Sequence, residues 1–319
     1  MFTYETMRRR PAAFKSMTGF SVEAFETLFG AFARAHQDRC QTATATKRGH
    51  QPRQRAFGAG RRFSHDVRTR LVMALVWLRI DPTYEVLGFL FSLDKSNARD
   101  NVRDALATLE TLADFRFEHP AADRKKKRSV DAVMDAFPDV RLVIDTKEQR
   151  IQRPTSTKEH DAQKPYYSGK KKCHTLKTEI GVRPDGQIGS ASTSVPGGAT
   201  HDLVLLRRTG LIGRLDEDEA AMLDKAYVGL AKDYPHIQLY IPFKASKNHP
   251  LTEEQKAYNR LIAKYRIVVE HTNAQLNQFQ VLTQVYRHDR DSHPRTVRVV
   301  SLLVNQRIRQ RPLKCYPTA

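Results

Sequence analysis

The stretch R-L-V-I-D, from Arg141 to Asp145, decides how the second half of this sequence is interpreted. An apolar run that ends in an acid is typical of a short buried strand whose last side chain projects past the hydrophobic layer towards solvent. The stretch A-A-M-L-D, from Ala220 to Asp224, repeats this pattern. If the two strands are neighbours, their aspartates meet, and paired carboxylates repel each other unless a cation lies between them. The two stretches together therefore predict a site for a hard cation such as Mg²⁺, which suits phosphodiester chemistry.

A third acid lies on a long helix that we expect from about Thr252 to Phe279. Glu270 falls beside the apolar stripe of this helix, on one flank with Arg266, Asn273 and Asn277. A side chain on that flank can reach a metal at the edge of a sheet, so Glu270 is the candidate third ligand. A surface pair with Arg266, four residues earlier, is the alternative for Glu270 alone. For either aspartate alone, a turn or strand-end aspartate is the commoner case.

The remaining patterns between these acids predict a mixed α/β fold. They comprise a hairpin, a helix capped by Thr200 or Asp202, and a further strand: His174 to Val182, a turn at Pro184-Asp185-Gly186, Gln187 to Val195, the helix to about Arg208, and Ile237 to Ile241.

The first half of the sequence reads as helical. We expect an amphipathic helix from Ser21 to Ala35, an irregular basic arm from Gln41 to Arg62, and a helix from Ser64 to Arg79. Thr83 caps the next helix, which ends near Phe91, and Ser96 starts another. The layout from Thr83 to Ala113 is that of a helix-turn-helix, with an ordinary helical hairpin as the alternative. The candidate DNA contacts on its second helix are Lys95, Asn97, Arg99 and Arg103.

The charge of the chain points to a polyanionic partner. The chain has 319 residues with 54 Lys and Arg against 35 Asp and Glu, a net charge of +19. The excess is concentrated in the arm, in Arg124 to Arg128, in Lys170 to Lys172 and in the tail after Tyr286. Clustered cations attract phosphates, although any single run is as often a solvated face. Four runs in one chain predict a nucleic-acid partner.

Other features exclude some classes of protein. The longest apolar run, Leu71 to Leu78, is far shorter than the roughly 20 residues that a membrane helix requires. No apolar segment typical of a signal peptide follows the first arginines, so we expect a cytoplasmic, nucleoid-associated protein. Cys40, Cys173 and Cys315 lie far apart in the sequence, which predicts reduced thiols rather than a disulfide framework or a zinc site.

Several short strings resemble those of one family. They are V-I-D-T-K-E around Asp145, I-Q-R-P at Ile151 to Pro154, Y-Y-S-G-K-K-K at Tyr166 to Lys172, H-T-L-K-T at His174 to Thr178, P-G-G-A-T-H-D at Pro196 to Asp202, D-K-A-Y at Asp224 to Tyr227 and R-I-V-V-E-H at Arg266 to His271. In this order and combination they look like bacterial insertion-sequence transposases of the DDE class, in the group named for insertion sequence five. The resemblance runs from about Thr83 to the tail.

The resemblance implies an α/β protein with a ribonuclease-H-like mixed-sheet catalytic core, preceded by an α-helical helix-turn-helix domain. The expected division is an N-terminal helix and arm (1–62), a helix-turn-helix domain (63–118), a basic linker (119–140), the catalytic domain (141–286) and a basic helical tail (287–319). Asp145, Asp224 and Glu270 would be the catalytic, metal-binding acids. Their cofactor would be two Mg²⁺ ions, with Mn²⁺ as a possible substitute.

The expected partner is double-stranded DNA, both the terminal inverted repeats of the element and its target, bound by a homodimer or larger oligomer. Lys170, Lys171, Lys172, His174 and Arg266 would hold the DNA backbone near the acids. A domesticated protein that binds DNA without catalysis, and an endonuclease that cuts without joining, are the alternatives.

The sequence departs from the family pattern at three places. Ala263 replaces a tyrosine and Asn277 replaces a lysine that related transposases often carry on the last helix. Thr146-Lys147 stands where a small residue and a threonine are common. The roles of the missing tyrosine and lysine are therefore not transferred to this chain.

Overall fold

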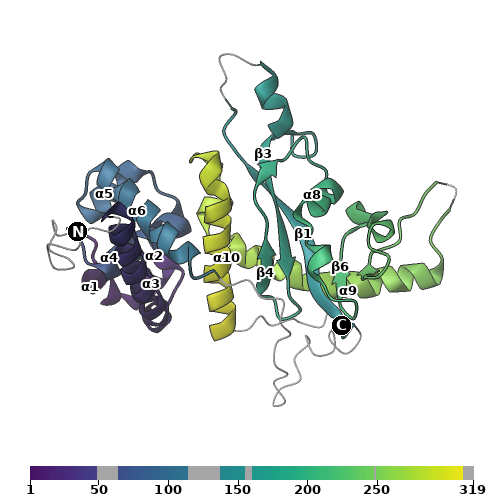
Figure 1. Ribbon diagram of the computed structural model, residues 1–319, viewed down its shortest axis with the longest axis horizontal. Helices are drawn as coiled ribbons and strands as arrows, with labels where there is room; N and C mark the ends of the chain where they lie inside the picture. The colour runs from purple at the N-terminus through teal and green to yellow at the C-terminus, as the bar shows by residue number, and fades with distance from the viewer. Residues whose placement is uncertain (49–63, 114–136, 155–159, 248, 312–319) are drawn as a thin grey trace. The chain divides into compact units, whose positions relative to one another are not determined.

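The computed structural model describes residues 1–48, 64–113, 137–154, 160–247 and 249–311. The chain divides into two compact units. The first contains Met1–Asp114 with Gln278–Val281 and Arg298–Leu302, and the second contains Phe115–Asn277, Leu282–Val297 and Leu303–Ala319. Figure 1 shows the helices of the first unit and the sheet of the second.

The first unit is helical and is organised around α4. Its helices are α1 (Tyr4–Arg8), α2 (Pro11–Thr18), α3 (Val22–Arg48), α4 (Val67–Ile80), α5 (Tyr84–Phe91) and α6 (Lys95–Glu110). The run Leu71 to Leu78 is buried on all sides of α4, and the other five helices contact this helix. A helix that is apolar all round belongs in a core, so the longest apolar run of the sequence is the centre of this unit.

The helices α5 and α6 start at side-chain caps. Thr83 caps α5 by accepting a hydrogen bond from Val86 N at 3.3 Å, as expected. The predicted start of the next helix at Ser96 is wrong, because Asp94 is the cap and accepts from Asn97 N at 2.8 Å. The stretch from Thr83 to Ala113 thus contains two consecutive helices, and their use as a DNA-binding motif stays a prediction.

Helix α3 is longer than its sequence pattern predicts. We expected its end at Ala35 and a basic arm from Gln41, but α3 continues to Arg48. Contacts with α6 hold the additional turns, since Arg39 Nη1 donates to the carbonyl of Asp104 at 3.2 Å and to Thr108 Oγ1 at 2.5 Å. The rest of the expected arm, and the basic block from Arg124 to Arg128, lie outside the described residues.

The second unit is built on a mixed sheet. Its strands are β1 (Val140–Arg150), β2 (Tyr167–Ser168), β3 (Cys173–Val182), β4 (Ile188–Ala191), β5 (Val195–Pro196), β6 (Ala220–Met222) and β7 (Gln238–Tyr240). The main order is β2-β3-β1-β6-β7, and β4 and β5 pair with β3. Strand β1 is antiparallel to β3 and parallel to β6, which is parallel to β7. The predicted mixed α/β class is confirmed, and this sheet is compatible with a ribonuclease-H-like core.

Strand β1 does not end at Asp145, as its apolar pattern predicted, but continues to Arg150. The reason is its pairing with β3, which continues from Asp145 opposite Ile180 to Arg150 opposite Thr175. Its parallel neighbour β6, in contrast, pairs only as far as Val143 opposite Met222. Asp145 therefore lies in the middle of a strand, just past the level where the parallel neighbour stops.

The two faces of β1 carry different layers. Leu142 and Ile144 pack in a hydrophobic cluster with Leu206 of α8 (Asp202–Thr209) and with Tyr227. Side chains alternate along a strand, so the odd-numbered residues from Asp145 face the other layer. That layer contains α9 (Glu253–Leu276), which contacts both β1 and β3.

The ends of these helices follow local capping. His201, rather than Thr200 or Asp202, caps α8, because its ring nitrogen Nδ1 accepts from Leu203 N at 3.3 Å. Thr252 begins α9, as predicted, in a capping box with Gln255. The tail forms α10 (His293–Gln310), whose apolar side chains are buried at Val297, Val300, Leu303, Val304 and Ile308.

Candidate active site

Asp145 on β1 and Asp224, which lies two residues past the end of β6, come from neighbouring parallel strands. Val143 pairs with Met222, and each aspartate follows its paired residue by two positions. Parallel strands lie about 4.8 Å apart, and residues at one level point to the same face. The pairing of β1 with β6 thus brings the two aspartates to the same edge of the sheet, and their meeting at a shared cation stays a prediction. Asp145 keeps 25% of its side-chain surface exposed and Asp224 keeps 45%.

Arg266 of α9 joins the two carboxylates. Its Nη1 lies 3.0 Å from Asp224 Oδ1, and its Nη2 lies 3.7 Å from Asp145 Oδ1. The guanidinium is only 17% exposed, and its Nε is buried without a hydrogen-bond partner. The sequence predicts that Arg266 contacts DNA or pairs with Glu270, whereas in this structure it lies between the two aspartates.

Glu270 lies one helical turn after Arg266 and is exposed. Burial raises the pKa of Asp145 above its usual range, and the charges of Glu270 and Asp224 raise it further, while Arg266 opposes them. Glu270 and Asp224 are therefore close enough to Asp145 to influence the pKa of its carboxyl group. An arginine between them offsets part of their mutual repulsion.

The donors at this site suit a hard cation, but they are not assembled around one point. Within the described ranges, no group of three or more His, Cys, Asp or Glu side chains is arranged to hold a metal ion. Carboxylate and amide oxygens are the ligands that Mg²⁺ prefers. Asn273 donates from Nδ2 to Asp145 Oδ2 at 3.2 Å, and its own Oδ1 is buried without a partner. An oxygen-rich site with an unsatisfied buried acceptor fits a divalent cation.

Beyond Asp145, the same face of β1 carries a polar row, defined here as Asp145, Lys147 and Gln149. Lys147 Nζ donates to Asn277 Oδ1 at the end of α9, and burial lowers the pKa of Lys147 to about 8. Gln149 Oε1 lies 2.9 Å from Nε2 of His293. Burial also lowers the pKa of His293 to about 4, so its imidazole is neutral at physiological pH.

Sequence reasoning did not single out Asn273 and Lys147 as site residues. The helical period places Asn273 on the same flank of α9 as Glu270. The alternation of side chains along β1 identifies Lys147 only once the strand is known to continue past Asp145.

The other predicted DNA contacts lie apart from the acids in the sequence and differ in exposure. Lys170 to Lys172 are exposed in the turn between β2 and β3, where Lys172 N donates to Ser168 O at 2.8 Å. His174 is partly buried and packs edge-on against Tyr167, with ring centroids 5.5 Å apart. In the first unit, the exposed side chains on α6 include Lys95, Asn97, Arg99 and Arg103.

Part of the predicted contact surface on α6 is occupied by local acids. Arg99 Nε lies 3.1 Å from Asp100 Oδ1, and Asn97 donates to the carboxylate of Asp94. Only Lys95 and Arg103, of the four predicted contacts, have no such interaction among the described residues.

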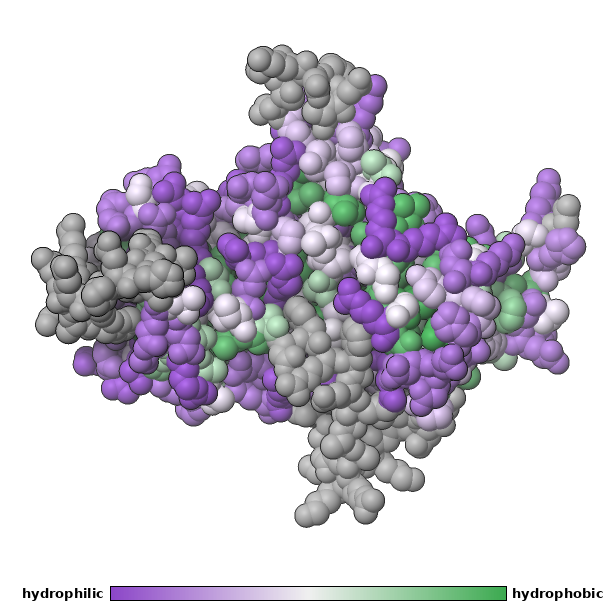
Figure 2. Space-filling model, viewed as in Figure 1, coloured by the Kyte–Doolittle hydropathy of each residue, from purple (hydrophilic) through white to green (hydrophobic). Residues whose placement is uncertain are grey.

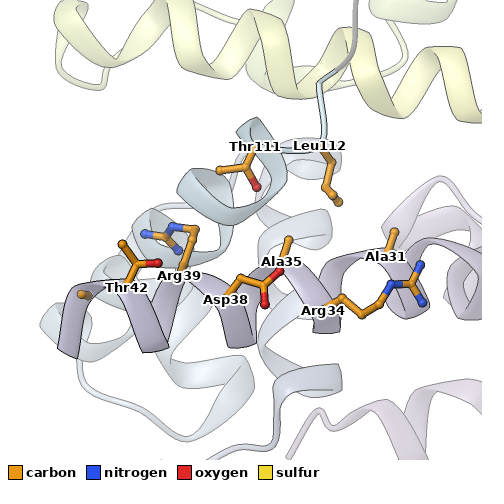
Figure 3. A pocket seen from close by; sticks show the side chains of 9 residues that line it. Ala31, Arg34, Ala35, Asp38, Arg39, Thr42, Thr111 and Leu112 are labelled. Atoms are coloured by element: carbon orange, nitrogen blue, oxygen red, sulfur yellow. The ribbon is translucent and has the colours of Figure 1, made fainter. Parts of the chain in front are cut away.

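A pocket of about 690 Å³ lies in the first unit, between α3 and the residues that follow α6. Figure 3 shows Arg34, Asp38 and Arg39 of α3 on one side and Thr111 and Leu112 on the other. None of the predicted site residues lines it, so it is not part of the candidate active site.

No helix in the described part of the chain is both long and apolar enough to cross a membrane. Hydrophilic side chains predominate on the face drawn in Figure 2, and the hydrophobic ones are scattered among them.

Comparison of the sequence with known proteins shows the family of the chain. Residues 144–305 match the family model described as DDE superfamily endonuclease. A probable transposase for insertion sequence element IS702 from Microchaete diplosiphon is 35% identical over 148 residues, which are 46% of this chain and 50% of that protein. The chain thus spans about half the length of the curated relative that it matches. No solved structure matches. The resemblance to insertion-sequence DDE transposases is confirmed, while the group named for insertion sequence five stays a prediction.

Proposed function

Because this chain belongs to the DDE superfamily of endonucleases, we propose that it is a DNA transposase that cuts the ends of its element and joins them to target DNA. One observation carries the proposal. Asp145 on β1 and Asp224, just past the end of the parallel strand β6, share the single guanidinium of Arg266, one turn before Glu270. The similarity to a probable transposase supports joining as well as cutting.

We assign Asp145, Asp224 and Glu270 as the catalytic acids and as the ligands of Mg²⁺, for which Mn²⁺ can substitute. A divalent cation at this site would stabilise the negative charge that develops on the attacking and leaving oxygens of a phosphodiester. The backbone of β1 and β6 fixes the two aspartates, and Asn273 orients Asp145 by its hydrogen bond. Water and then a DNA 3′-hydroxyl are the nucleophiles, so the reaction requires no covalent protein intermediate.

Arg266 has two roles in this proposal. In the DNA-free protein it holds the two aspartates close together despite their like charges. When DNA binds, the guanidinium can exchange a carboxylate for two oxygens of a phosphate, because its planar fork of N–H donors binds such oxygen pairs bidentately.

DNA is bound outside this centre as well. We assign α5 and α6 as the helix-turn-helix, with Lys95 and Arg103 as the contacts that no local acid occupies and Asn97 and Arg99 as further contacts. The basic turn at Lys170 to Lys172 and His174 would hold the DNA backbone. The working unit would be at least a homodimer, because two terminal inverted repeats must be brought together.

The test uses a plasmid that carries the DNA flanking the gene, incubated with protein and Mg²⁺. Asp145→Asn, Asp224→Asn and Glu270→Gln should each lower cleavage by at least about 1,000-fold while DNA binding survives. Asp218→Asn, which removes an exposed acid in the turn before β6, is the matched control and should cut like the wild type. Full activity in any of the three acid variants would refute the assignment of the acids.

An endonuclease that cuts without joining is the second candidate, because the matching family is described as an endonuclease. A duplex with a pre-cut element end and a free 3′-hydroxyl separates the two. A transposase inserts this end into a target plasmid, and a nuclease leaves it unjoined. A wild-type protein that binds DNA but neither cuts nor joins would support a domesticated DNA-binding protein instead.

A further inference from the structure

Lys147 is held in an unusual position for a lysine. It follows Asp145 by two residues on the same face of β1, so the two side chains lie roughly 7 Å apart along the strand. Its Nζ donates to the side-chain oxygen of Asn277, the residue that ends α9. Lys147 is partly buried. The fold therefore directs an ammonium group into the layer that contains the catalytic acids.

No carboxylate among the described residues forms an ion pair with this ammonium group. Among the residues that the structure describes, Lys147 forms no ion pair, and its hydrogen-bond acceptor is the neutral amide of Asn277. The charged groups that influence it are Asp145, which also interacts with Arg266, and Lys171, which repels it. A partly buried cation without a countercharge is costly, and a second cation nearby makes the local excess of positive charge larger.

The position of Lys171 is determined by the turn between β2 and β3. Ser168 closes this turn, since its hydroxyl accepts from Lys171 N at 3.3 Å and its carbonyl accepts from Lys172 N at 2.8 Å. Lys172 adopts a left-handed conformation with φ of 54°. The exposed side chain of Lys171 is thus carried by a defined turn and not by a random segment.

We propose that Lys147 and Lys171 together form a phosphate-binding site beside Asp145, which binds a backbone phosphate of DNA next to the one that is cut. Lys147 comes from β1 and Lys171 from the turn before β3, and the DNA phosphate would supply the countercharge that Lys147 lacks among the described residues. The site deepens the proposed function and rests on it, because a phosphate bound here would set the register of the strand relative to the acids.

A structural lysine in this protein is recognisably different. Lys177 is buried and contacts Asp202 at 2.8 Å, Glu148 at 3.4 Å and the carbonyl of Thr200 at 2.8 Å. Its charge is balanced and its hydrogen bonds are satisfied within the protein. Among the described residues Lys147 has no ion pair and donates only to the neutral amide of Asn277, which favours an external partner.

The test measures binding of a labelled DNA duplex of about 30 base pairs and arbitrary sequence, without divalent ions, as NaCl is varied from about 50 to 200 mM. Lys147→Met and Lys171→Met should each weaken binding by about 5- to 10-fold and lower the slope of log affinity against log salt by about 1, the effect of one lost phosphate contact. Lys232→Met removes an exposed lysine from the same unit and should match the wild type. Lys147→Arg, which keeps the charge, should bind within about twofold of the wild type.

The melting temperature separates a binding role from a structural one. Lys147→Met should melt at the same temperature as the wild type or higher, because a poorly compensated charge is removed. Asn277→Ala should keep the wild-type salt slope. A Lys147→Met protein with the affinity and slope of Lys232→Met would overturn the proposal, and so would a loss of binding accompanied by an equal melting defect in Lys147→Met and Asn277→Ala.

The same data distinguish this inference from the proposed function. If the wild type fails to cut DNA while the lysine variants lose one phosphate contact, the transposase assignment fails and the phosphate site stands. If the wild type cuts and joins DNA while Lys147→Met binds and cuts equally well, the phosphate site fails and the assignment stands.

Discussion

The two faces of β1 each place one cation between two carboxylates, but with opposite results. On the face towards α8, Lys177 is 7% exposed and lies 2.8 Å from Asp202 and 3.4 Å from Glu148. On the face towards α9, Arg266 is 17% exposed and lies 3.0 Å from Asp224 and 3.7 Å from Asp145. The first group is closed to solvent, and the backbone carbonyl of Thr200 accepts a further hydrogen bond from the ammonium group of Lys177. The second is open, because Asp224 is 45% exposed and both Arg266 Nε and Asn273 Oδ1 are unsatisfied.

The difference shows how a structural charge cluster can be told from a functional one in the same fold. Both clusters have the same ratio of charges, so counting charges does not separate them. The two clusters differ instead in whether their hydrogen bonds are satisfied and in whether solvent can reach them. A closed cluster stabilises the fold, whereas an open one keeps acceptors and donors available for a ligand.

The largest expected effect tests this distinction directly. Lys177→Met should lower the free energy of unfolding by about 3–5 kcal/mol, because it leaves Glu148 and Asp202 without their shared cation in a buried position. Arg266→Met should change it by less than about 1 kcal/mol, since Asp224 remains hydrated. Urea denaturation at neutral pH measures both values. Equal losses in the two variants would break the comparison.

The polar row offers a second test, because its far end at Gln149 is closed. The pKa of His293 is about 4 in the folded protein, below its usual value of 6.5. Because the pKa of His293 is lower in the folded protein, protonation of this histidine opposes folding. Neutral His293 therefore makes its full contribution to the free energy of unfolding above pH 6.5, and this contribution is lost as the pH falls from 6.5 towards 4. The slope is roughly 1.4 kcal/mol per pH unit, or about 3 kcal/mol over the whole window.

This effect is measured as the difference between the wild type and His293→Gln in denaturation at a series of pH values. The difference should change with pH below 6.5 and be constant above it. His236→Gln, which replaces an exposed histidine of the same unit, should follow the wild type throughout. A constant difference between the wild type and His293→Gln down to pH 4 would contradict a neutral buried His293.

Glu179 is the exception on the closed face. It is 1% exposed, accepts a hydrogen bond from Thr209 Oγ1 at 2.8 Å, and has a second carboxylate oxygen without a partner. Burial raises its pKa to about 7. The protonated form therefore favours folding, and this contribution is complete below pH 4.5 and is lost as the pH rises from 4.5 to 7.

Glu179→Gln should accordingly be more stable than the wild type by about 3 kcal/mol at pH 8, where the wild-type carboxylate is charged, and about equal to it at pH 4.5. The amide oxygen can still accept from Thr209. Thermal melting at the two pH values checks this. A variant that is less stable at both would show that the carboxylate has an additional partner and that the α8 face is closed throughout.

The smallest expected effect concerns the stability of a variant in the open cluster around Arg266. Asp145→Asn should raise the free energy of unfolding by up to about 1 kcal/mol at pH 7, because it removes a carboxylate that burial and two neighbouring acids disfavour. The same substitution should abolish cleavage. Chemical denaturation of the purified variant is the measurement, and a loss of stability instead would show that the pair with Arg266 outweighs these penalties.

Much of the site was predictable because its parts are encoded locally. The two apolar runs before Asp145 and Asp224, and the helical flank with Arg266, Glu270 and Asn273, are visible as periodicity. The cap at Thr252 and the hairpin around Pro184 to Gly186 are equally local. Parallel pairing of β1 with β6 then follows from the expectation that two similar runs are neighbours.

The remainder depends on long-range contacts that periodicity does not contain. Strand β1 continues through polar residues because β3 pairs with them, and α3 continues because Arg39 reaches α6. The bridge from Arg266 to both aspartates, and the contact of Lys147 with Asn277, join residues more than 40 positions apart. Only the tertiary structure shows which of several polar residues on a flank are used.

Because Asp145 lies in the interior of a paired strand, the position of an insertion in the gene determines whether the site survives it. A codon inserted between Arg141 and Ile144 would shift every later residue of β1 by one place and turn the side chain of Asp145 towards the hydrophobic core under α8. All the amino acids of the site would still be encoded, yet the two faces would be exchanged. The gene is therefore expected to tolerate length changes in its connecting loops and to lose its activity through a single in-frame insertion in this one strand.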